Sequence, residues 1–302
     1  MNATLINDQH TQDERLRDLI LEIDELPSIP ETLIEILKVL DDPDSGPADL
    51  GAVIRLDAPL MARILRLANS PYYSRRGDIT DINRCVTVLG YRTVRQVAIC
   101  VSVATSVISA LEKSSGQMDY RELWRHSVVT GAISKHLAQI AGYPDPEEAF
   151  TAGLLHDMGK FVLELHAPDL YHRVIADRRT SRVSLVEAEE AVFGYNHAMI
   201  GQAFGQAWRF PRILTRCFGE HHTPVLGGQA VDKTDHAVAL VALADYLANT
   251  LEPSRSDLGF DPRFCMVAEL HQIAGLAVDA VENDLERIRE SVTLASAYLD
   301  LS

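Results

Sequence analysis

Apolar residues recur along this chain at the spacing of an α-helix almost everywhere. The first clear example is a face formed by Leu33, Ile36, Leu37 and Leu40, which follows Pro30. Residues three and four apart lie on one side of a helix, whereas a half-buried strand alternates apolar and polar positions. Strand-like alternation is almost absent from the sequence. The pattern therefore predicts an all-α protein.

Capping residues and helix breakers mark where these helices begin and end. Asp57 is a good N-cap for a helix with Pro59 in its first turn, and Ser184 with Glu187 has the spacing of a capping box. Gly90 ends the predicted helix over residues 81–89. The predicted helices cover about 81–89, 91–111, 120–140, 197–208 and 211–221, with one into the 150s, one from 184, one through 245 and a long amphipathic stretch over 278–299.

A short polar run divides the chain. Residues 113–117 read Lys-Ser-Ser-Gly-Gln, a composition typical of a linker. We therefore expect two lobes, a smaller N-terminal one and a larger C-terminal helical bundle. The expected division is an N-terminal extension at 1–23, a first lobe at 24–116, a second lobe with the candidate site at 117–250 and a C-terminal helical segment at 251–302.

The charge balance argues against nucleic acid as a partner. The 302 residues include 43 acidic and 28 basic side chains, so the formal net charge is −15. Nucleic-acid phosphates and anionic lipids repel such a protein unless it has a local basic patch. The densest basic run, Arg178-Arg179 with Arg182, is short. We expect binding to neither nucleic acid nor membranes.

The cysteines and the N-terminus are typical of a cytoplasmic protein. Cys85, Cys100, Cys217 and Cys265 are scattered without a C-x-x-C pair, so we interpret them as small buried hydrophobes. The first twenty residues lack the apolar region of a signal peptide. No stretch approaches the roughly 18 charge-free apolar residues of a membrane span. We therefore expect a cytoplasmic location.

The stretch with the clearest chemistry is Gly-Leu-Leu-His-Asp-Met-Gly-Lys at 153–160. Its adjacent imidazole and carboxylate, His156 and Asp157, suit a divalent metal, and the carboxylate can bridge two ions. Gly159 permits a tight helix end beside a site. Lys160 offers a cation for a phosphate oxygen. Asp157 and Lys160 are therefore the candidate catalytic residues.

Further metal-ligating residue types accompany this pair. Glu122 and His126 are four apart and share one helix face, and Asp245 lies in an apolar helix where a carboxylate needs a buried partner. The candidate metal ligands are Glu122, His126, His156, Asp157, His197, His221, His222 and Asp245. Nitrogen and oxygen donors without a thiol indicate one or two divalent ions of iron, manganese, zinc or magnesium.

These residues also have structural interpretations. His156 and Asp157 could hydrogen-bond to each other at a helix junction, and Glu122 could form a solvated pair with His126. His197 could act as part of a helix cap. The ordered set favours a metal site or the remnant of one.

Several ordered blocks resemble the HDOD family, the HD-related output domains of bacterial signalling. Residues 153–160 also resemble the signature of HD-superfamily phosphohydrolases. The blocks span about residues 24–224 and read LPSIPETLIEIL (26–37), LDDPDSGPADLGAVIRLDAPLMARILRLANSPYY (40–73), VTVLGYRTVRQVAI (86–99), LWRHSVVTG (123–131), EEAFTAGLLHDMGK (147–160) and HAMIGQAFGQAWRFP (197–211). The resemblance implies an HD-superfamily bundle as the C-terminal lobe. It also implies a regulatory or interaction role, in a family of which many members lack the metal ligands.

The order of the ligands is similar to that of HD-GYP cyclic-di-GMP phosphodiesterases, with Glu122 placed as in members that carry an extra carboxylate. After His222, however, the chain reads Thr-Pro-Val-Leu-Gly-Gly, where that family has an acidic residue and a Gly-Tyr-Pro block. This departure argues against cyclic-dinucleotide specificity and leaves the metal ligands intact.

Two functions follow from the sequence. The first is a signal-transduction output or regulatory protein with a metal-binding HD site and with protein partners. The alternative is a metal-dependent phosphohydrolase or phosphodiesterase acting on a nucleotide or cyclic nucleotide. The long C-terminal stretch could cap the core, which is the default, or mediate a homodimer.

Overall fold

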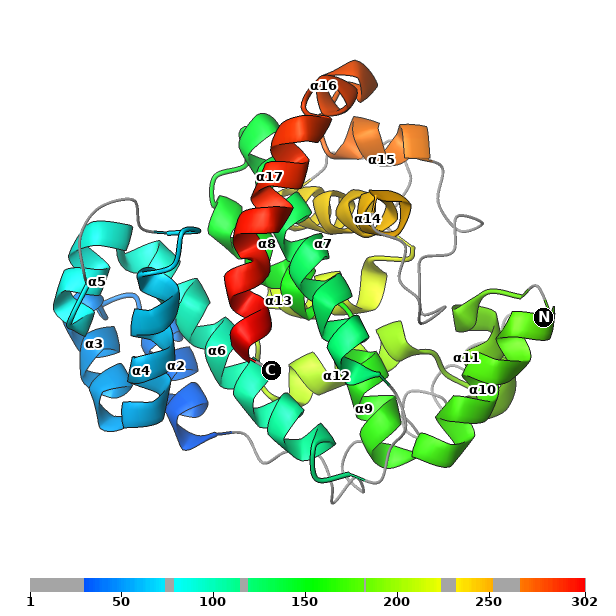
Figure 1. The fold of residues 1–302 in the computed structure, drawn as a ribbon, viewed down its shortest axis with the longest axis horizontal. Coiled ribbons are helices and arrows are strands. Elements are labelled where there is room, and N and C mark those ends of the chain that lie inside the picture. Colours follow the sequence, from blue (N-terminus) through cyan, green and yellow to red (C-terminus); the bar gives the residue numbers. More distant parts are fainter. Residues whose placement is uncertain are drawn as a thin grey trace.

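The computed structural model describes residues 30–73, 79–114, 119–181, 183–223, 232–251 and 267–301. Within these ranges every regular element is a helix and no strand is present. The helices form two lobes, a smaller N-terminal one and a larger one beside it (Figure 1). The prediction of an all-α, two-lobed protein is confirmed.

The smaller lobe packs four short helices together. α2 (Glu31–Asp41) turns its predicted apolar face inward, and both Leu33 and Ile36 are fully buried. Asp57 caps α4 as predicted, because its Oδ1 accepts a hydrogen bond from the Leu60 amide at 2.9 Å. The other helices of this lobe are α3 (Pro47–Leu56), α4 (Ala58–Ala68) and α5 (Ile82–Leu89).

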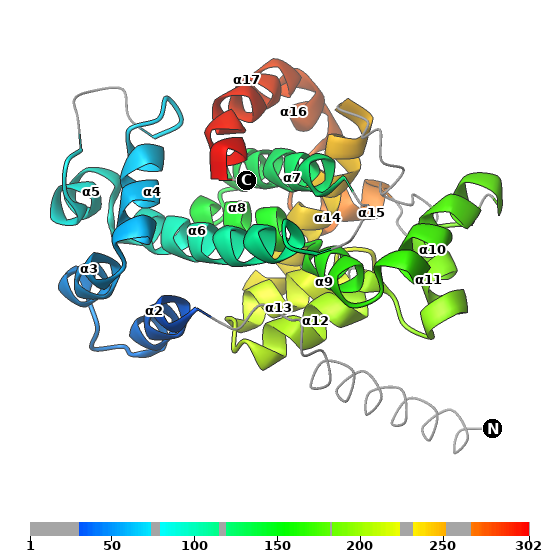
Figure 2. The same ribbon diagram turned by 60° about the horizontal axis from the view of Figure 1, so that its bottom comes forward.

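α6 (Tyr91–Leu111) joins the two lobes. It contacts α2, α4 and α5 in the smaller lobe, and α8 (Pro146–Leu155) and α9 (Met158–His166) in the larger one. Figure 2 shows it running from one lobe into the other. Contacts on both sides explain why its sequence is apolar over nearly its whole length.

By length and composition α6 could cross a membrane, and it is the one such helix in the described part of the chain. The expectation that no stretch approaches a membrane span was therefore wrong for this helix. In the fold, 72% of its most apolar 18-residue window is buried. Its apolar side chains form the core between the lobes.

The larger lobe is a bundle that surrounds α8. α7 (Tyr120–Ile140) packs along α8 and contacts α14 on another side, while α12 contacts both α9 and α13. A pair of helices, α10 and α11, projects from this bundle beyond α9 (Figure 1). The remaining bounds are α10 (Pro168–Ser181), α11 (Leu185–Phe193), α12 (His197–Ala207), α13 (Arg212–Glu220) and α14 (Lys233–Leu251).

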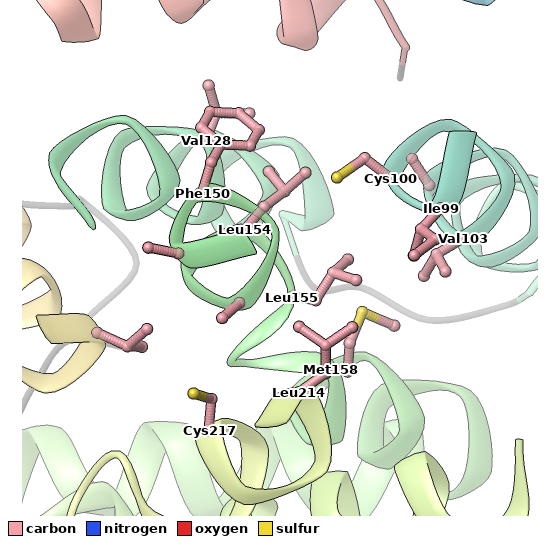
Figure 3. Packing of buried hydrophobic residues seen from close by; sticks show 14 of the residues in the cluster. Ile99, Cys100, Val103, Val128, Phe150, Leu154, Leu155, Met158, Leu214 and Cys217 are labelled. Carbon is pink, nitrogen blue, oxygen red and sulfur yellow. The ribbon is translucent and has the colours of Figure 1, made fainter. Parts of the chain in front are cut away.

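The core between α6 and α8 holds the start of α9 in place. Figure 3 shows Cys100 and Val103 of α6 beside Leu154 and Leu155 of α8, with Met158 at the first position of α9. All five side chains are at most 1% exposed. The predicted site residues at 156 and 157 therefore lie in a junction anchored on both sides.

Three of the cysteines behave as predicted. Cys85, Cys100 and Cys217 are buried free thiols. Burial raises the pKa of Cys85 to about 11, with a further contribution from the Asp81 charge. Cys265 lies outside the described residues.

The C-terminal stretch is broken rather than continuous. The long amphipathic stretch expected over 278–299 divides at Asp284, whose carboxylate lies 2.6 Å from His136 Nε2 on α7. At the end of the stretch Tyr298 is fully buried, and its carbonyl accepts a hydrogen bond from Trp124 Nε1 at 3.1 Å. The segment therefore caps the core. Its elements are α15 (Val267–Ile273), α16 (Val278–Asn283), α17 (Leu285–Ala295) and the 3₁₀ helix η2 (Ser296–Leu301).

The predicted division into four segments stays a prediction. The N-terminal extension 1–23 lies outside the described residues, as do residues 115–118, which include the predicted boundary at 116. Residues 252–266, just after the boundary at 250, are also outside them. α6 belongs to the predicted first lobe and also packs against the second.

Gly153 tests how closely α7 and α8 must approach. A methyl group at this position would lie 2.3 Å from Ser134 Oγ and 2.9 Å from the Thr130 carbonyl oxygen. We expect Gly153→Ala to lower the free energy of unfolding by about 1–2 kcal/mol in urea denaturation, because overpacking of up to about 3 kcal/mol outweighs the ~1 kcal/mol gained in helix propensity.

Gly46→Ala is the matched control, since a methyl group there meets nothing within 4 Å and the residue lies outside the helices. Its effect is expected to stay below about 1 kcal/mol. Equal stability of Gly153→Ala and the unchanged protein would contradict the close packing of these two helices.

Candidate metal centre

Seven of the eight predicted ligands meet in one buried place inside the larger lobe. They come from α7, the α8–α9 junction, the start of α12, the end of α13 and the middle of α14. None is more than 7% exposed. The seven residues are His126, His156, Asp157, His197, His221, His222 and Asp245. The structure thus brings together residues that are up to 119 positions apart in the chain.

Asp157 lies between two groups of imidazoles. Its Oδ1 is 3.5 Å from His197 Nε2 and 3.6 Å from His221 Nε2. Its Oδ2 is 3.3 Å from His156 Nε2 and 3.8 Å from His126 Nε2. Each carboxylate oxygen therefore faces a different pair of nitrogens, the arrangement expected of a carboxylate that bridges two ions.

Two further residues complete the two groups. Asp245 Oδ1 lies 2.9 Å from His126 Nε2 and 3.7 Å from His156 Nε2. On the other side, His222 Nε2 lies 2.8 Å from His197 Nε2. One group therefore has two imidazoles and two carboxylates, and the other has three imidazoles and the shared carboxylate.

The spacing of these atoms fits metal ligands better than hydrogen bonds. Within the described residues, His156 Nε2, His221 Nε2 and Asp157 Oδ1 have no hydrogen-bond partner although they are buried. Ligands about 2.1 Å from one ion, at angles of 90–110°, are about 3.0–3.4 Å apart. The distances of 3.3 Å and 3.5 Å from Asp157 to His156 and His197 are close to this range. The residues present therefore fit a divalent metal.

Hydrogen bonds on the far side of two of these imidazoles direct their Nε2 atoms toward the centre. His156 Nδ1 donates to the Gly153 carbonyl at 2.7 Å. His221 Nδ1 lies 2.9 Å from the Phe218 carbonyl. A proton on Nδ1 leaves the Nε2 lone pair available, which is how proteins commonly prepare histidine ligands.

The backbone must also come unusually close at this place. α8 ends at Leu155, and α9 begins again at Met158 after only two residues. A methyl group at Gly159 would lie 1.8 Å from the carbonyl oxygen of His197, at the start of α12. Glycine is therefore required for the starts of α9 and α12 to touch, as the sequence predicts for a tight helix end beside a site.

The electrostatics of the site keep the two carboxylates charged. Burial by itself would raise the pKa of Asp157, but the neighbouring His156 and Lys160 hold it well below the usual value. The pKa of Asp245 is also lowered against the effect of burial, by the hydrogen-bonded His126 and the nearby His156. Carboxylates are thus in the form that binds metal.

Three of the imidazoles have pKa values that are shifted in different directions. Burial, with a contribution from Lys160, holds the pKa of His197 well below the usual value, and burial does the same for His222. For His156, burial lowers the pKa, but Asp157 and Asp245 outweigh it and raise the pKa to about 10. Two buried carboxylates therefore demand positive charge nearby, which a divalent cation also supplies.

Comparison with known proteins identifies the family to which the chain belongs. The family model for the HDOD domain matches residues 26–224, about two thirds of the chain. The chain belongs to the HDOD domain family. Of the seven clustered ligands, only Asp245 lies beyond the matched range.

Solved structures share this fold. An HDOD domain protein of unknown function from Geobacter sulfurreducens is 24% identical, with 95% of this chain and 98% of that chain covered and a TM-score of 0.76. A candidate phosphohydrolase from Shewanella amazonensis SB2B is 26% identical over 94% and 97% of the chains, with a TM-score of 0.73. A candidate signal transduction protein from Marinobacter aquaeolei VT8 is 21% identical over 99% and 66%, with a TM-score of 0.75.

One curated relative is considerably longer. An uncharacterized protein from Treponema pallidum (strain Nichols) is 25% identical over 201 residues, which is 66% of this chain and 38% of that protein. The matched part of that protein is about as long as the HDOD match in this chain, so the chain spans well under half of the relative's length.

Lys160 and Glu122 stand apart from the other predicted residues. Lys160 is buried and its Nζ donates to Asp157 Oδ2 at 2.7 Å, so it neutralises the shared carboxylate. Glu122 lies one turn before His126 on α7, with its carboxylate 3.8 Å from Arg125 Nε. It is not among the ligand atoms that cluster within 4.8 Å in the described residues. The catalytic role of Lys160 and the ligand role of Glu122 stay predictions.

Sequence reasoning missed a carboxylate that supports the site. Glu189 on α11 is fully buried, and its Oε2 accepts hydrogen bonds from both His197 Nδ1 at 2.7 Å and the His197 amide at 2.8 Å. Tyr171 donates to its other oxygen at 3.1 Å. Burial raises the pKa of Glu189 to about 8. The only local signal was its spacing of four from the buried Leu185.

Asn249 was missed for a similar reason. Its Nδ2 donates to Asp245 Oδ1 at 2.9 Å from one turn further along α14. The spacing of four could have suggested this pair once Asp245 was selected. This hydrogen bond helps to hold the Asp245 carboxylate in the position where its Oδ1 contacts His126 Nε2.

Glu189 provides a test of how His197 is held. We expect Glu189→Gln to weaken Mn²⁺ or Zn²⁺ binding by about 10–100-fold, because the amide cannot accept both hydrogen bonds in the same way and the imidazole loses its alignment. The measurement is competition with a chelating dye at constant pH.

The control is Glu286→Gln, which makes the same side-chain replacement at an exposed position. It should leave the affinity unchanged. Equal affinities of Glu189→Gln and the unchanged protein would show that His197 needs no support from α11.

Proposed function

We propose that this HDOD protein is a signal-transduction output protein whose larger lobe holds a divalent-metal centre. Membership of the HDOD family supports a regulatory role, and the Marinobacter structure of the same fold is named for signal transduction. The observation that carries the metal centre is the convergence of seven buried nitrogen and oxygen ligands around Asp157. Protein partners and a cytoplasmic location are part of the same proposal.

The ligands divide into two candidate positions for an ion. His126, His156 and Asp245 would hold one ion, while a second group, His197, His221 and His222, would hold the other. Asp157 would bridge them. Five imidazoles and two carboxylates favour iron, manganese or zinc over magnesium, which prefers oxygen donors and retained water.

When bound, such ions polarise phosphoryl oxygens and lower the pKa of bound water. The protein itself supplies orientation and charge balance. Gly153 and Glu189 fix the rings of His156 and His197, and Lys160 removes part of the negative charge of Asp157. The surrounding apolar helices keep bulk water away from these groups.

Deep burial favours regulation over turnover of a large substrate. The seven ligand side chains are 0–7% exposed, so a nucleotide could reach them only if helices around the site moved. A metal site closed in this way can stabilise or report one conformation of the larger lobe. We propose that partners read this conformation.

A metal-dependent phosphohydrolase acting on a nucleotide or cyclic nucleotide is the second candidate. The complete ligand set and the cation of Lys160 beside Asp157 favour it. The Shewanella structure, at 26% identity, is named as a candidate phosphohydrolase.

Metal content separates these functions from a purely structural cluster. We expect protein purified without chelator or nickel to contain one or two equivalents of a transition metal by elemental analysis. Asp157→Asn should lose most of it, because the substitution removes the charge shared by both groups. The exposed His166→Gln is the control and should retain the metal.

Turnover then separates the two functions. The metal-loaded protein is tested against nucleotides, cyclic nucleotides and generic phosphodiesters, and a signalling protein should hydrolyse none of them. Hydrolysis that disappears in Asp157→Asn would establish the enzyme instead. Absence of stoichiometric metal from the unchanged protein would remove both.

A further inference from the structure

A second feature of the molecule is an apolar groove between the two lobes. None of the seven clustered histidine and aspartate residues lines it. It has a volume of about 360 Å³. One wall is a face of α2 and the other is the end of α12 and the turn after it. The lining residues are Ile34, Leu37, Lys38, Asp41, Ala207, Trp208 and Arg209, and we name it the α2–α12 groove.

The floor of this groove is apolar and its rim is charged. Leu37 and Trp208 are buried beneath it, whereas Ile34 remains 37% exposed. The charged lining residues are Lys38, Asp41 and Arg209. Lys38 Nζ lies 2.6 Å from Glu35 Oε1, so the exposed Arg209 is the cation of the rim that can meet an acidic segment. An acidic, amphipathic segment would therefore complement it.

Arg209 holds an unusual backbone conformation at the rim. Its φ is +55°, the one positive value for a non-glycine residue in the described part of the chain. The conformation ends α12, since the Phe210 amide bonds to the Gly205 carbonyl at 2.9 Å. Glycine would adopt it with less strain, so the cationic side chain is kept here against a local preference.

We infer that the α2–α12 groove is a docking site for the N-terminal segment of this same chain, residues 13–26. Residues 1–29 lie outside the described ranges, and only their sequence bears on this inference. The family match begins at residue 26, so all but the last residue of the segment precedes the matched range.

The segment has the pattern of an amphipathic helix. Leu16, Leu19, Ile20 and Ile23 follow the spacing i, i+3, i+4 and i+7. Residues 13–25 contain six acidic residues and two arginines, a net charge of −4. Its apolar stripe matches the floor of the groove, and its negative charge complements Arg209 at the rim.

The tether makes this occupant more favourable than a separate partner. Residues 27–30, Pro-Ser-Ile-Pro, connect the segment to α2, and four residues span at most about 14 Å. Ile34 in the groove wall lies one turn into α2. A short connection gives an effective concentration in the millimolar range, which an untethered helix would rarely reach.

Competition with a synthetic peptide tests the inference in the full chain. The probe is a labelled peptide of residues 10–27, measured by fluorescence anisotropy. Leu19→Glu/Ile20→Glu disrupts the apolar stripe of the tethered segment. The control Asn7→Glu/Gln9→Glu adds the same charge outside that stripe.

We expect the Leu19→Glu/Ile20→Glu protein to bind the peptide at least about tenfold more tightly than the unchanged protein, because its own segment no longer competes. The control should behave as the unchanged protein does. Adding Ala207→Glu or Arg209→Glu, both at exposed positions of the groove, should weaken peptide binding about tenfold or more.

Other results would overturn the inference. Equal binding by the unchanged and Leu19→Glu/Ile20→Glu proteins would leave the groove to another partner. Failure of every variant to bind the peptide would show that the segment docks elsewhere. A concentration-dependent dimer that Leu19→Glu/Ile20→Glu dissolves in sedimentation would make the occupant a second copy. Metal content is expected to be unchanged in all these variants, so failure here is distinguishable from failure of the proposed function.

Discussion

The carboxylate of Asp157 is charged in a place that bulk water does not reach, and much of the larger lobe is arranged around this fact. A buried anion is tolerated only where opposite charge and hydrogen bonds replace its hydration. Lys160 supplies one such contact at 2.7 Å, and imidazoles approach both carboxylate oxygens. Asp245 adds a second buried carboxylate. The site therefore has more lone pairs on nitrogen and oxygen than hydrogen bonds within the site can satisfy. A bound cation would satisfy them better.

This chemistry depends on backbones that come very close together. Gly159 lets the start of α9 touch the start of α12, and Gly153 lets α8 pack against α7. The core beneath α6 holds the same junction from the other side (Figure 3). A small shift of any of these helices would separate nitrogens and oxygens that must remain within a few tenths of an ångström of ligand spacing. Stability and the spacing of these nitrogen and oxygen atoms are thus properties of one packing arrangement.

α12 connects the two features that we regard as functional. Its first residue, His197, belongs to the candidate metal centre, and Trp208, just beyond its end, forms part of the floor of the α2–α12 groove. Eleven residues of helix span about 16 Å. A change at the metal centre that shifted α12 would therefore reach the interface of the two lobes. This is a physical route by which a closed metal site can influence a docking surface.

The sequence by itself determined the helical class, the bounds of α6 and α7, the caps at Asp57 and Ser184 and seven of the residues that cluster in the candidate metal centre, because these follow from local spacing and side-chain chemistry. Only the tertiary structure decided that Glu189 orients His197, that α6 serves both lobes and that the C-terminal stretch breaks at Asp284. Each of these depends on a partner distant in sequence. Glu189 and Glu190 have the same chemistry, and only the packing of α11 buries one and exposes the other.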